Sequence, residues 1–346
     1  GHITQMIQLM QKLIENGSAY APGNGDVYLE VSKLKAYLTL YNQKLDDLQS
    51  AEDADLTYKK DPRDFALWKA AKPGDPSWPT PWGDGRPGWH IECSAMSTHH
   101  LGNHFDIHGG GMDLTFPHHE NEIAQSEGAN HCSFVNTWMH VGFVNINDEK
   151  MSKSLNNFFT IREALEKYDG ETLRYFLISS HYRSPLNFSD ENLASAKSAL
   201  TRLYTAIRGL SASTKAMDQV SMRFDYEKRF NEALDDDFNT PIALSILFEI
   251  AKHANTERED DKDQAGALSE LLKKLGSHIG IMGYDADDYL KMGIELSDEE
   301  IDEKIRQRES ARAAKDFAMS DQIRDELLAL GVILEDSING TTWRRK

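Results

Sequence analysis

Cys93, His118 and Glu122 are three residues whose side chains commonly bind zinc, and they lie in two neighbouring segments of the chain. A thiolate, an imidazole and a carboxylate are all ligands that zinc accepts. Glu122 follows His118 by four positions, so on a helix the two side chains lie on one face. The spacing alone leaves other interpretations open, because a cysteine is often a small buried apolar residue and a histidine can cap a helix.

The elements that must position these residues alternate between helix and strand. Helices are predicted over 91–101 and 117–127, a buried strand over 105–108, and a further strand within 134–144. Alternation of this kind is typical of an α/β domain with a parallel sheet.

The flanking regions have a different character. Apolar residues at helical spacing predict a helix over 3–14 with Gly17 as its C-cap, and a strand is predicted over 27–31. Later in the chain, Thr240 is expected to cap a helix and the charged segment 258–263 to form a solvated loop between helices.

The C-terminal region carries its own start signal for a helix. Ser297 and Glu300 form the pattern of a capping box, which predicts a helical hairpin beginning there. A terminal strand is predicted over 331–335.

Composition limits the class of protein. The chain has 346 residues, 40% of them apolar, which suits several domains with real cores. No apolar run is long enough to span a bilayer, and two cysteines favour a reducing cytoplasm over a secreted disulfide scaffold. The net charge of −18 would by itself argue against nucleic-acid binding. That argument is weak, because the net charge is a sum over the whole surface, whereas binding depends on a local patch of charge. Basic residues do gather at 343–346.

Three segments, 88–93, 109–122 and 150–154, resemble the active-site half of the cysteinyl-tRNA synthetases, a family of class I aminoacyl-tRNA synthetases. The resemblance implies activation of cysteine by Mg-ATP to cysteinyl-adenylate, followed by transfer of cysteine to the 3′ end of cysteine tRNA. The expected partners are therefore cysteine, ATP and cysteine tRNA, with no membrane, and we expect a cytoplasmic monomer.

The same resemblance implies one zinc ion per chain, bound by Cys93, His118 and Glu122, with Trp89 as a wall of the amino-acid pocket. A thiolate binds zinc much better than a hydroxyl does, so the metal would distinguish cysteine from serine. The family's first zinc cysteine would precede Gly1, and Cys132 does not occupy its place.

The segment 150–154 matches a class I signature, which implies that Lys150 and Lys153 are catalytic and that Lys153 contacts the phosphates of ATP. Two ammonium groups on a loop can neutralise the charge that develops as pyrophosphate leaves. Gly109 and Gly110 would let the backbone approach the adenosine, and Asp113 would accept a hydrogen bond from the ribose.

The other class I signature, HIGH, is absent from the sequence; the similar string at 100–103 follows Cys93 and does not take its place. We therefore expect the chain to be an N-terminally truncated synthetase that does not activate cysteine by itself.

The implied fold is α/β: a partial Rossmann-like class I catalytic domain with a connective insertion, then an α-helical bundle and a small α+β anticodon-binding domain. The expected boundaries are 1–84 for the insertion, 85–148 for the second half of the catalytic domain, 149–195 for the signature loop and stem-contact region, 196–290 for the bundle and 291–346 for the anticodon-binding domain.

Four residues of the last domain match positions that read the anticodon in the family: Arg312, Asp321, Asp336 and Trp343. Trp343 would stack on an unpaired base, and the charged residues would bond to base edges. Two alternatives stay open. One is a cysteine:sugar-amine ligase of the same fold, and the other is a non-catalytic tRNA-binding fragment.

Overall fold

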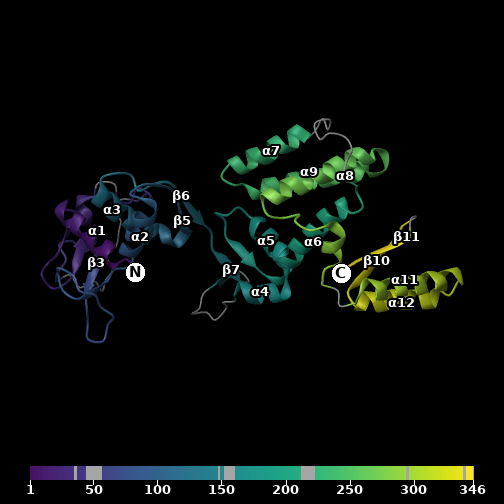
Figure 1. Cartoon of the computed structure of the whole chain (residues 1–346), viewed down its shortest axis with the longest axis horizontal. Coiled ribbons are helices and arrows are strands. Elements are labelled where there is room, and N and C mark those ends of the chain that lie inside the picture. Colours follow the sequence, from purple (N-terminus) through teal and green to yellow (C-terminus); the bar gives the residue numbers. More distant parts are fainter. Residues whose placement is uncertain are drawn as a thin grey trace. The chain divides into compact units, whose positions relative to one another are not determined.

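The computed structural model describes residues 1–34, 37–43, 57–146, 149–151, 160–211, 223–293, 296–337 and 340–345 (Figure 1). Backbone contacts divide the chain into two units, 1–143 and 144–346. This division into two units does not test the five domain boundaries expected from the sequence, which stay predictions.

The first unit begins with helix α1 (Ile3–Glu15), as its apolar spacing predicted. Met6, Leu9, Met10 and Leu13 form one buried face. The helix ends at Asn16, and Gly17 follows with φ of +73°, a backbone conformation that glycine adopts without strain.

A four-stranded antiparallel sheet follows α1. Its strands are β1 (Ala19–Tyr20), β2 (Val27–Leu29), β3 (Phe65–Ala70) and β4 (Gly85–Pro87), in that order, and a 3₁₀ turn η1 (Val31–Lys33) comes after β2. The buried Asp64 ties the turn to the sheet, because its carboxylate accepts from Val31 N at 3.0 Å and from the Tyr20 hydroxyl at 2.8 Å.

The rest of the first unit is the α/β region. It consists of α2 (Ile91–Leu101), β5 (Phe105–Gly111), the short turns η3 (Met112–Leu114) and η4 (Thr115–His119), α3 (Glu120–Asn130) and β6 (Val135–Val141). Strands β5 and β6 pair in parallel, which confirms the predicted pairing. Helices α1, α2 and α3 pack on one another through a shared apolar core.

Two details of this region differ from the sequence prediction. The strand expected to be buried is largely exposed, with Ile107 at 59%, because β5 and β6 form a sheet of only two described strands. The regular helix begins at Glu120 rather than Pro117, because Phe116 is extended and interrupts the preceding turn.

The second unit begins with a three-stranded sheet of order β8-β7-β9, formed by β7 (Val144–Ile146), β8 (Glu149–Lys150) and β9 (Leu186–Phe188). Strands β7 and β9 are parallel. Helices α4 (Ile161–Lys167) and α5 (Gly170–Ile178) lie between β8 and β9 in the chain, and each has a side-chain cap, from Thr160 and Asp169 respectively.

Five helices follow, and together with α5 they enclose a large apolar core: α6 (Asp190–Ile207), α7 (Arg223–Asp235), α8 (Thr240–Asp260), α9 (Lys262–His278) and α10 (Ala286–Lys291). The cap of α8 is Asn239, one residue before the predicted Thr240. The charged segment 258–263 is not a loop, because only Asp261 lies outside the two helices. Arg258 turns back instead and donates to the carbonyl oxygens of Ala206 and Arg208.

The chain ends in a small region with its own core. Helices α11 (Asp298–Ala313) and α12 (Phe317–Ala329) form the predicted hairpin, and the capping box of Ser297 and Glu300 is present. Strand β10 (Val332–Ser337) pairs with β11 (Gly340–Arg345), a second strand that was not predicted from the sequence. No helix of the described residues is long and apolar enough to cross a membrane.

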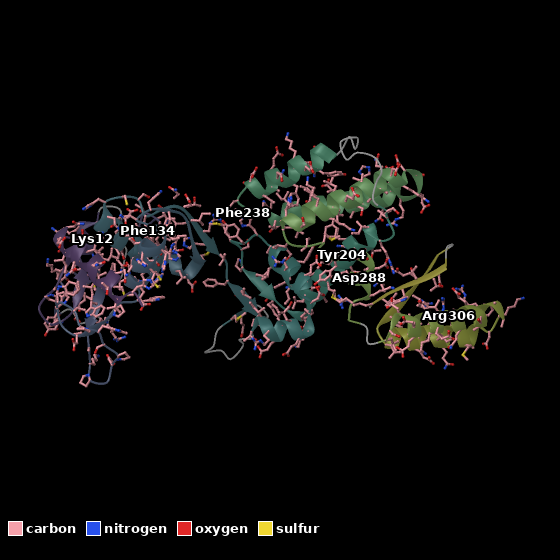
Figure 2. All side chains as sticks on the ribbon, in the orientation of Figure 1. Lys12, Phe134, Tyr204, Phe238, Asp288 and Arg306 are labelled. Carbon is pink, nitrogen blue, oxygen red and sulfur yellow. The ribbon has the colours of Figure 1, made fainter. Side chains whose placement is uncertain are left out.

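A buried carboxylate fastens the helical bundle to the segment that follows α9. Glu171, on α5, accepts from the hydroxyl of Tyr204 at 2.8 Å and from the backbone N–H groups of Met282 and Gly283. Tyr204 lies on α6 and is labelled in Figure 2. Burial raises the pKa of Glu171, and these donors oppose that effect by stabilising the ionised form.

Replacing Glu171 with alanine would leave two buried donors, the Tyr204 hydroxyl and the Met282 N–H, without their acceptor. We therefore expect Glu171→Ala to lower the free energy of unfolding by about 2–4 kcal/mol. Urea unfolding followed by the helical circular dichroism signal measures this. Glu166→Ala removes an exposed glutamate from α4 and serves as the control, expected to change stability by less than about 0.5 kcal/mol. Equal effects of the two variants would contradict the assigned role of Glu171.

Candidate functional site

Cys93, His118 and Glu122 converge at one end of the packed helices α2 and α3. The Cys93 sulfur, a ring nitrogen of His118 and a carboxylate oxygen of Glu122 all lie within 4.8 Å of one another. Cys93 is in the first turn of α2. His118 precedes α3, and it still faces Glu122 because the intervening His119 already has helical backbone angles.

Glu122 is fully buried, and neither of its carboxylate oxygens accepts a hydrogen bond from the described residues. His118 Nε2 lies 2.7 Å from Oε1, and His108 Nε2 lies 3.2 Å from Oε2, but neither contact has hydrogen-bond geometry. A buried carboxylate without donors is costly unless a cation balances it. The donor set therefore fits a zinc ion, with three protein ligands of the types that zinc prefers.

Further histidines surround this cluster. His118 Nδ1 lies 2.8 Å from His90 Nδ1, and His119 Nδ1 lies 2.8 Å from His140 Nε2. Burial lowers the pKa of His90 to about 4 and of His119 to about 3, so both rings are neutral at neutral pH. Partners of this kind hold a ligating imidazole in one orientation and one tautomer.

His108 belongs to this site, and the sequence analysis missed it. With His119 and Glu122 it forms a second group of possible ligands within 4.8 Å. Burial lowers its pKa, although the nearby Glu122 carboxylate opposes that effect. The only sequence signal was a histidine in a strand directly before three glycines.

The thiol of Cys93 is held in its protonated form by its surroundings. Burial raises its pKa to about 11, and the negative charges of Glu122 and Glu92 act in the same direction. A bound cation would reverse this preference, because thiolate is the form that coordinates a metal. Cys132 takes no part: it is exposed, and its sulfur lies 3.7 Å from the carbonyl oxygen of Asn103.

The neighbouring Glu120 has a different role from Glu122. Its buried carboxylate accepts from the backbone N–H groups of Leu38 at 2.9 Å and Tyr41 at 2.6 Å. Asn121 accepts from the Tyr37 hydroxyl at 2.6 Å. These two residues anchor the segment 37–41 against α3, which leaves Glu122 as the carboxylate directed at the cluster.

Trp89 is 63% exposed and so is not a core residue. Its ring centroid lies 4.7 Å from that of His118 and 5.2 Å from that of His90. The indole therefore borders the cluster on its accessible side, where a pocket wall was expected.

The residues expected to bind ATP are only partly described. Gly109 and Gly110 lie on β5, and Asp113 lies in η3. A Cβ at Gly110 would be 2.8 Å from the His119 ring, so in this structure the glycine makes room for a histidine. Lys150 is in β8, opposite Asn145 of β7, while Lys153 lies outside the described residues.

The two aspartates expected to read the anticodon, Asp336 and Asp321, have different surroundings. Asp336 accepts from Arg308 in a bidentate pair at 2.7 and 2.8 Å, from Arg312 at 3.2 Å and from the Thr341 hydroxyl at 2.8 Å. Hydrogen bonds from Arg308 and Thr341 keep the pKa of Asp336 well below its usual range. This carboxylate thus joins α11 to the β10–β11 hairpin, while Asp321 is exposed on α12.

Trp343 differs from its expected role. It is 4% exposed, packs in the core of the C-terminal region, and has the Lys291 ammonium 4.8 Å from its ring centroid. The described arrangement therefore offers no open face of this indole for a base. The alternation along β11 explains this, since Trp343 points to the helices and its neighbours point away.

Comparisons with known proteins show which families the chain is similar to. Residues 1–198 match the family model described as the catalytic domain of class I (C) tRNA synthetases, 229–283 match a DALR domain, and 297–344 match the cysteinyl-tRNA ligase anticodon-binding domain. A putative arginyl-tRNA synthetase from Campylobacter jejuni shares the fold, with a TM-score of 0.50 over 82% of this chain and 62% of its own, at 13% identity. The family match and the fold thus show a class I aminoacyl-tRNA synthetase, which confirms the expected fold class.

Two relatives narrow the class to a family. A cysteine–tRNA ligase from Thioalkalivibrio sulfidiphilus is 56% identical over 99% of this chain and 75% of its own length. One from Laribacter hongkongensis is 55% identical over 99% of this chain and 74% of its own length. The chain belongs to the cysteine–tRNA ligase family.

The contacts of Asp336 predict a structural effect that distinguishes it from Asp321. Asp336→Ala would leave the buried Arg308 guanidinium without its carboxylate. Because the Asp336 side chain is itself 44% exposed, we expect a loss of about 1–3 kcal/mol in the local stability of the hairpin. Amide hydrogen exchange of β10 and β11 measures it, with Asp321→Ala as the control. Undiminished protection in Asp336→Ala would show that the pair does not hold the hairpin.

Proposed function

We propose that this chain carries the cysteine-selecting site and the tRNA-reading end of a cysteine–tRNA ligase, which joins cysteine to its tRNA at the expense of ATP. The observation that carries the proposal is the convergence of Cys93, His118 and the donorless carboxylate of Glu122. The chain belongs to the cysteine–tRNA ligase family over nearly its whole length, and this indicates cysteine as the substrate of the cluster.

Zinc is the metal we assign to the cluster, with Cys93, His118 and Glu122 as its protein ligands. When bound, it supplies a coordination position that takes a thiolate in preference to a hydroxyl. An apolar pocket distinguishes two side chains of similar size by only about 1–3 kcal/mol. Direct recognition of the sulfur is thus the stronger basis for choosing cysteine over serine.

The surrounding residues of this chain would position the amino acid and its site. Trp89 borders the cluster and would cover the bound cysteine from solvent. The contact of His90 with His118 keeps the Nε2 atom of His118 directed towards Glu122. Asp113 and the backbone at Gly109 and Gly110 are proposed to contact ATP, supported by their place at the end of β5 in a class I fold.

Lys150 and Lys153 are proposed to neutralise the phosphate charge that develops when the cysteine carboxylate attacks the α-phosphorus and pyrophosphate leaves. Both belong to the class I signature segment 150–154, whose first residue, Lys150, ends strand β8 and pairs with Asn145 of β7. ATP is the nucleotide substrate, brought as its Mg²⁺ complex.

The C-terminal region is proposed to read the tRNA anticodon. The match of 297–344 to the family's anticodon-binding domain supports this, and it favours tRNA over a sugar amine as the acceptor. Arg312 and Asp321 are the exposed candidates for base contacts. Asp336 would act by positioning Arg312, to which it is bonded.

Zinc content tests the first part of the proposal. We expect the chain purified with added zinc and dialysed to retain about one zinc ion, and Cys93→Ala and His118→Ala each to retain much less. Elemental analysis by mass spectrometry measures the ratio. Cys132→Ala is the matched control, because that cysteine is exposed and lies outside the cluster. Equal zinc loss from Cys93→Ala and Cys132→Ala would remove the cluster as the metal site.

Binding of cysteine tRNA tests the second part, beside the same tRNA with its anticodon changed. We expect the changed anticodon to weaken binding, and Arg312→Ala to cost about 1–3 kcal/mol with the cognate tRNA and less with the altered one. Fluorescence anisotropy at one stated salt concentration measures both.

Arg306→Ala is the matched control for Arg312→Ala. Arg306, labelled in Figure 2, carries the same charge and lies six positions earlier on α11, which places it on another face of the helix. Equal and salt-sensitive binding of both tRNAs, with the two variants indistinguishable, would count against anticodon reading by this region.

A further inference from the structure

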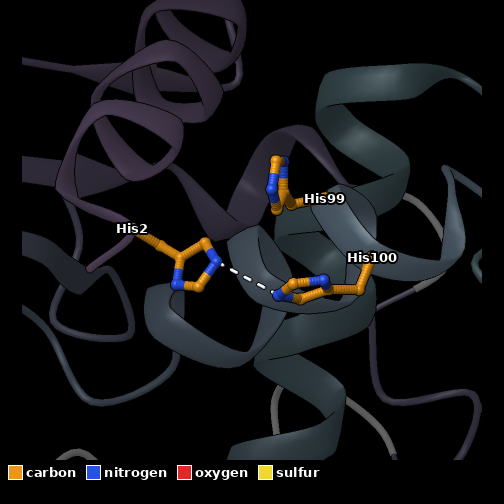
Figure 3. Close-up of side chains that lie close together, drawn as sticks. All are labelled: His2, His99 and His100. Carbon is orange, nitrogen blue, oxygen red and sulfur yellow. Dashed lines mark hydrogen bonds between the residues drawn. The ribbon is translucent and has the colours of Figure 1, made fainter.

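A second histidine cluster lies at the other end of α2 from Cys93. His99 and His100 are in the last turn of α2, and His2 stands directly before the first residue of α1 (Figure 3). Cys93 is in the first turn of α2. At 1.5 Å of rise per residue, the two clusters are about 9 Å apart along the helix axis. The three histidines are therefore separate from the cysteine-selecting site.

The three rings converge on a single point rather than spreading over the surface. One ring nitrogen from each of His2, His99 and His100 lies within 4.8 Å of the other two. The ring centroids are 5.2 Å apart for His2 and His99, 5.1 Å for His2 and His100, and 4.8 Å for His99 and His100. The side chains of successive helix residues normally point in different directions. Here the rings of His99 and His100 instead lie close together, and both lie beside His2.

The distances suit a shared metal ion. His100 Nε2 lies 3.2 Å from His2 Nε2, the contact drawn as a dashed line in Figure 3. Two imidazoles that each bind zinc at about 2.0–2.1 Å in a tetrahedral site have their nitrogens roughly 3.3 Å apart. The pair is thus already spaced as two ligands of one ion, and a ring nitrogen of His99 lies within 4.8 Å of both, as a possible third ligand.

The exposure of the rings also suits an ion. His99 and His100 are exposed, which gives an ion access and leaves room for water in the remaining position. Three neutral nitrogen donors favour zinc, nickel or copper over magnesium or calcium.

We propose that His2, His99 and His100 form a second metal site, which binds a divalent transition ion that prefers imidazole and links the start of α1 to the end of α2. This site does not depend on the proposed function. Its ion would bridge two helices whose apolar faces already pack together, so it would brace the unit that holds Cys93 without touching the reacting groups.

Calorimetric titration with Ni²⁺ tests the proposal on the full chain, without a histidine tag and dialysed until about one zinc ion per chain remains. We expect one Ni²⁺ to bind, and His99→Ala and His100→Ala each to raise the dissociation constant by at least about tenfold. His278→Ala is the control, because it removes an exposed histidine of α9 in the other unit and should leave the affinity unchanged.

Cys93→Ala separates the two sites. We expect it to lose zinc while its Ni²⁺ affinity stays within about twofold, and we expect His100→Ala to keep its zinc and its circular dichroism spectrum. Loss of Ni²⁺ binding in Cys93→Ala but not in His100→Ala would place the ion in the first cluster and overturn the proposal. Ni²⁺ binding that is equally weak in all variants would overturn it too.

Discussion

The buried carboxylate of Glu122 is the constraint on which the rest of the site depends. It has no hydrogen-bond donor among the described residues, and two imidazole nitrogens and a thiol face it. Such a group is tolerated only where a cation can balance it. The helix α3 that carries it must therefore pack closely on α2, which carries Cys93, and the shared apolar core of α1, α2 and α3 provides that packing.

Two glutamates on one turn show how tertiary contacts divide similar residues between structure and chemistry. Glu120 and Glu122 are both buried, yet Glu120 receives backbone N–H groups from the segment 37–41 while Glu122 receives none. The carboxylate of Glu120 thus holds a loop, and that of Glu122 is the one proposed to bind a metal. The histidines also have different roles. His90 contacts His118 and His140 contacts His119, and each of these contacts holds the ring of a possible ligand in place.

In the second unit, arginine side chains are paired with carboxylates. Although the chain carries a net charge of −18, its C-terminal region joins α11 to the β10–β11 hairpin through Arg308 and Asp336, and Arg344 of β11 pairs with Glu335 of β10. Each buried guanidinium is matched by a carboxylate, which lets the small core form. Arg312 and Asp321 are more exposed and are the residues of this region proposed to contact tRNA.

The sequence by itself determined the family and most helices, because local spacing and capping residues act over a few positions. It also predicted Cys93, His118 and Glu122 as metal ligands, and the structure brings these three side chains together. It did not determine which side chains share a site from distant segments. His108 joined the cluster only because its ring, on β5, meets Glu122 of α3. Trp343 was expected to stack on a base, but it is a core residue because β11 folds back on β10. His2 met His99 and His100 only through the packing of α1 on α2. Those outcomes depend on contacts between residues far apart in the chain, and only the tertiary structure decides them.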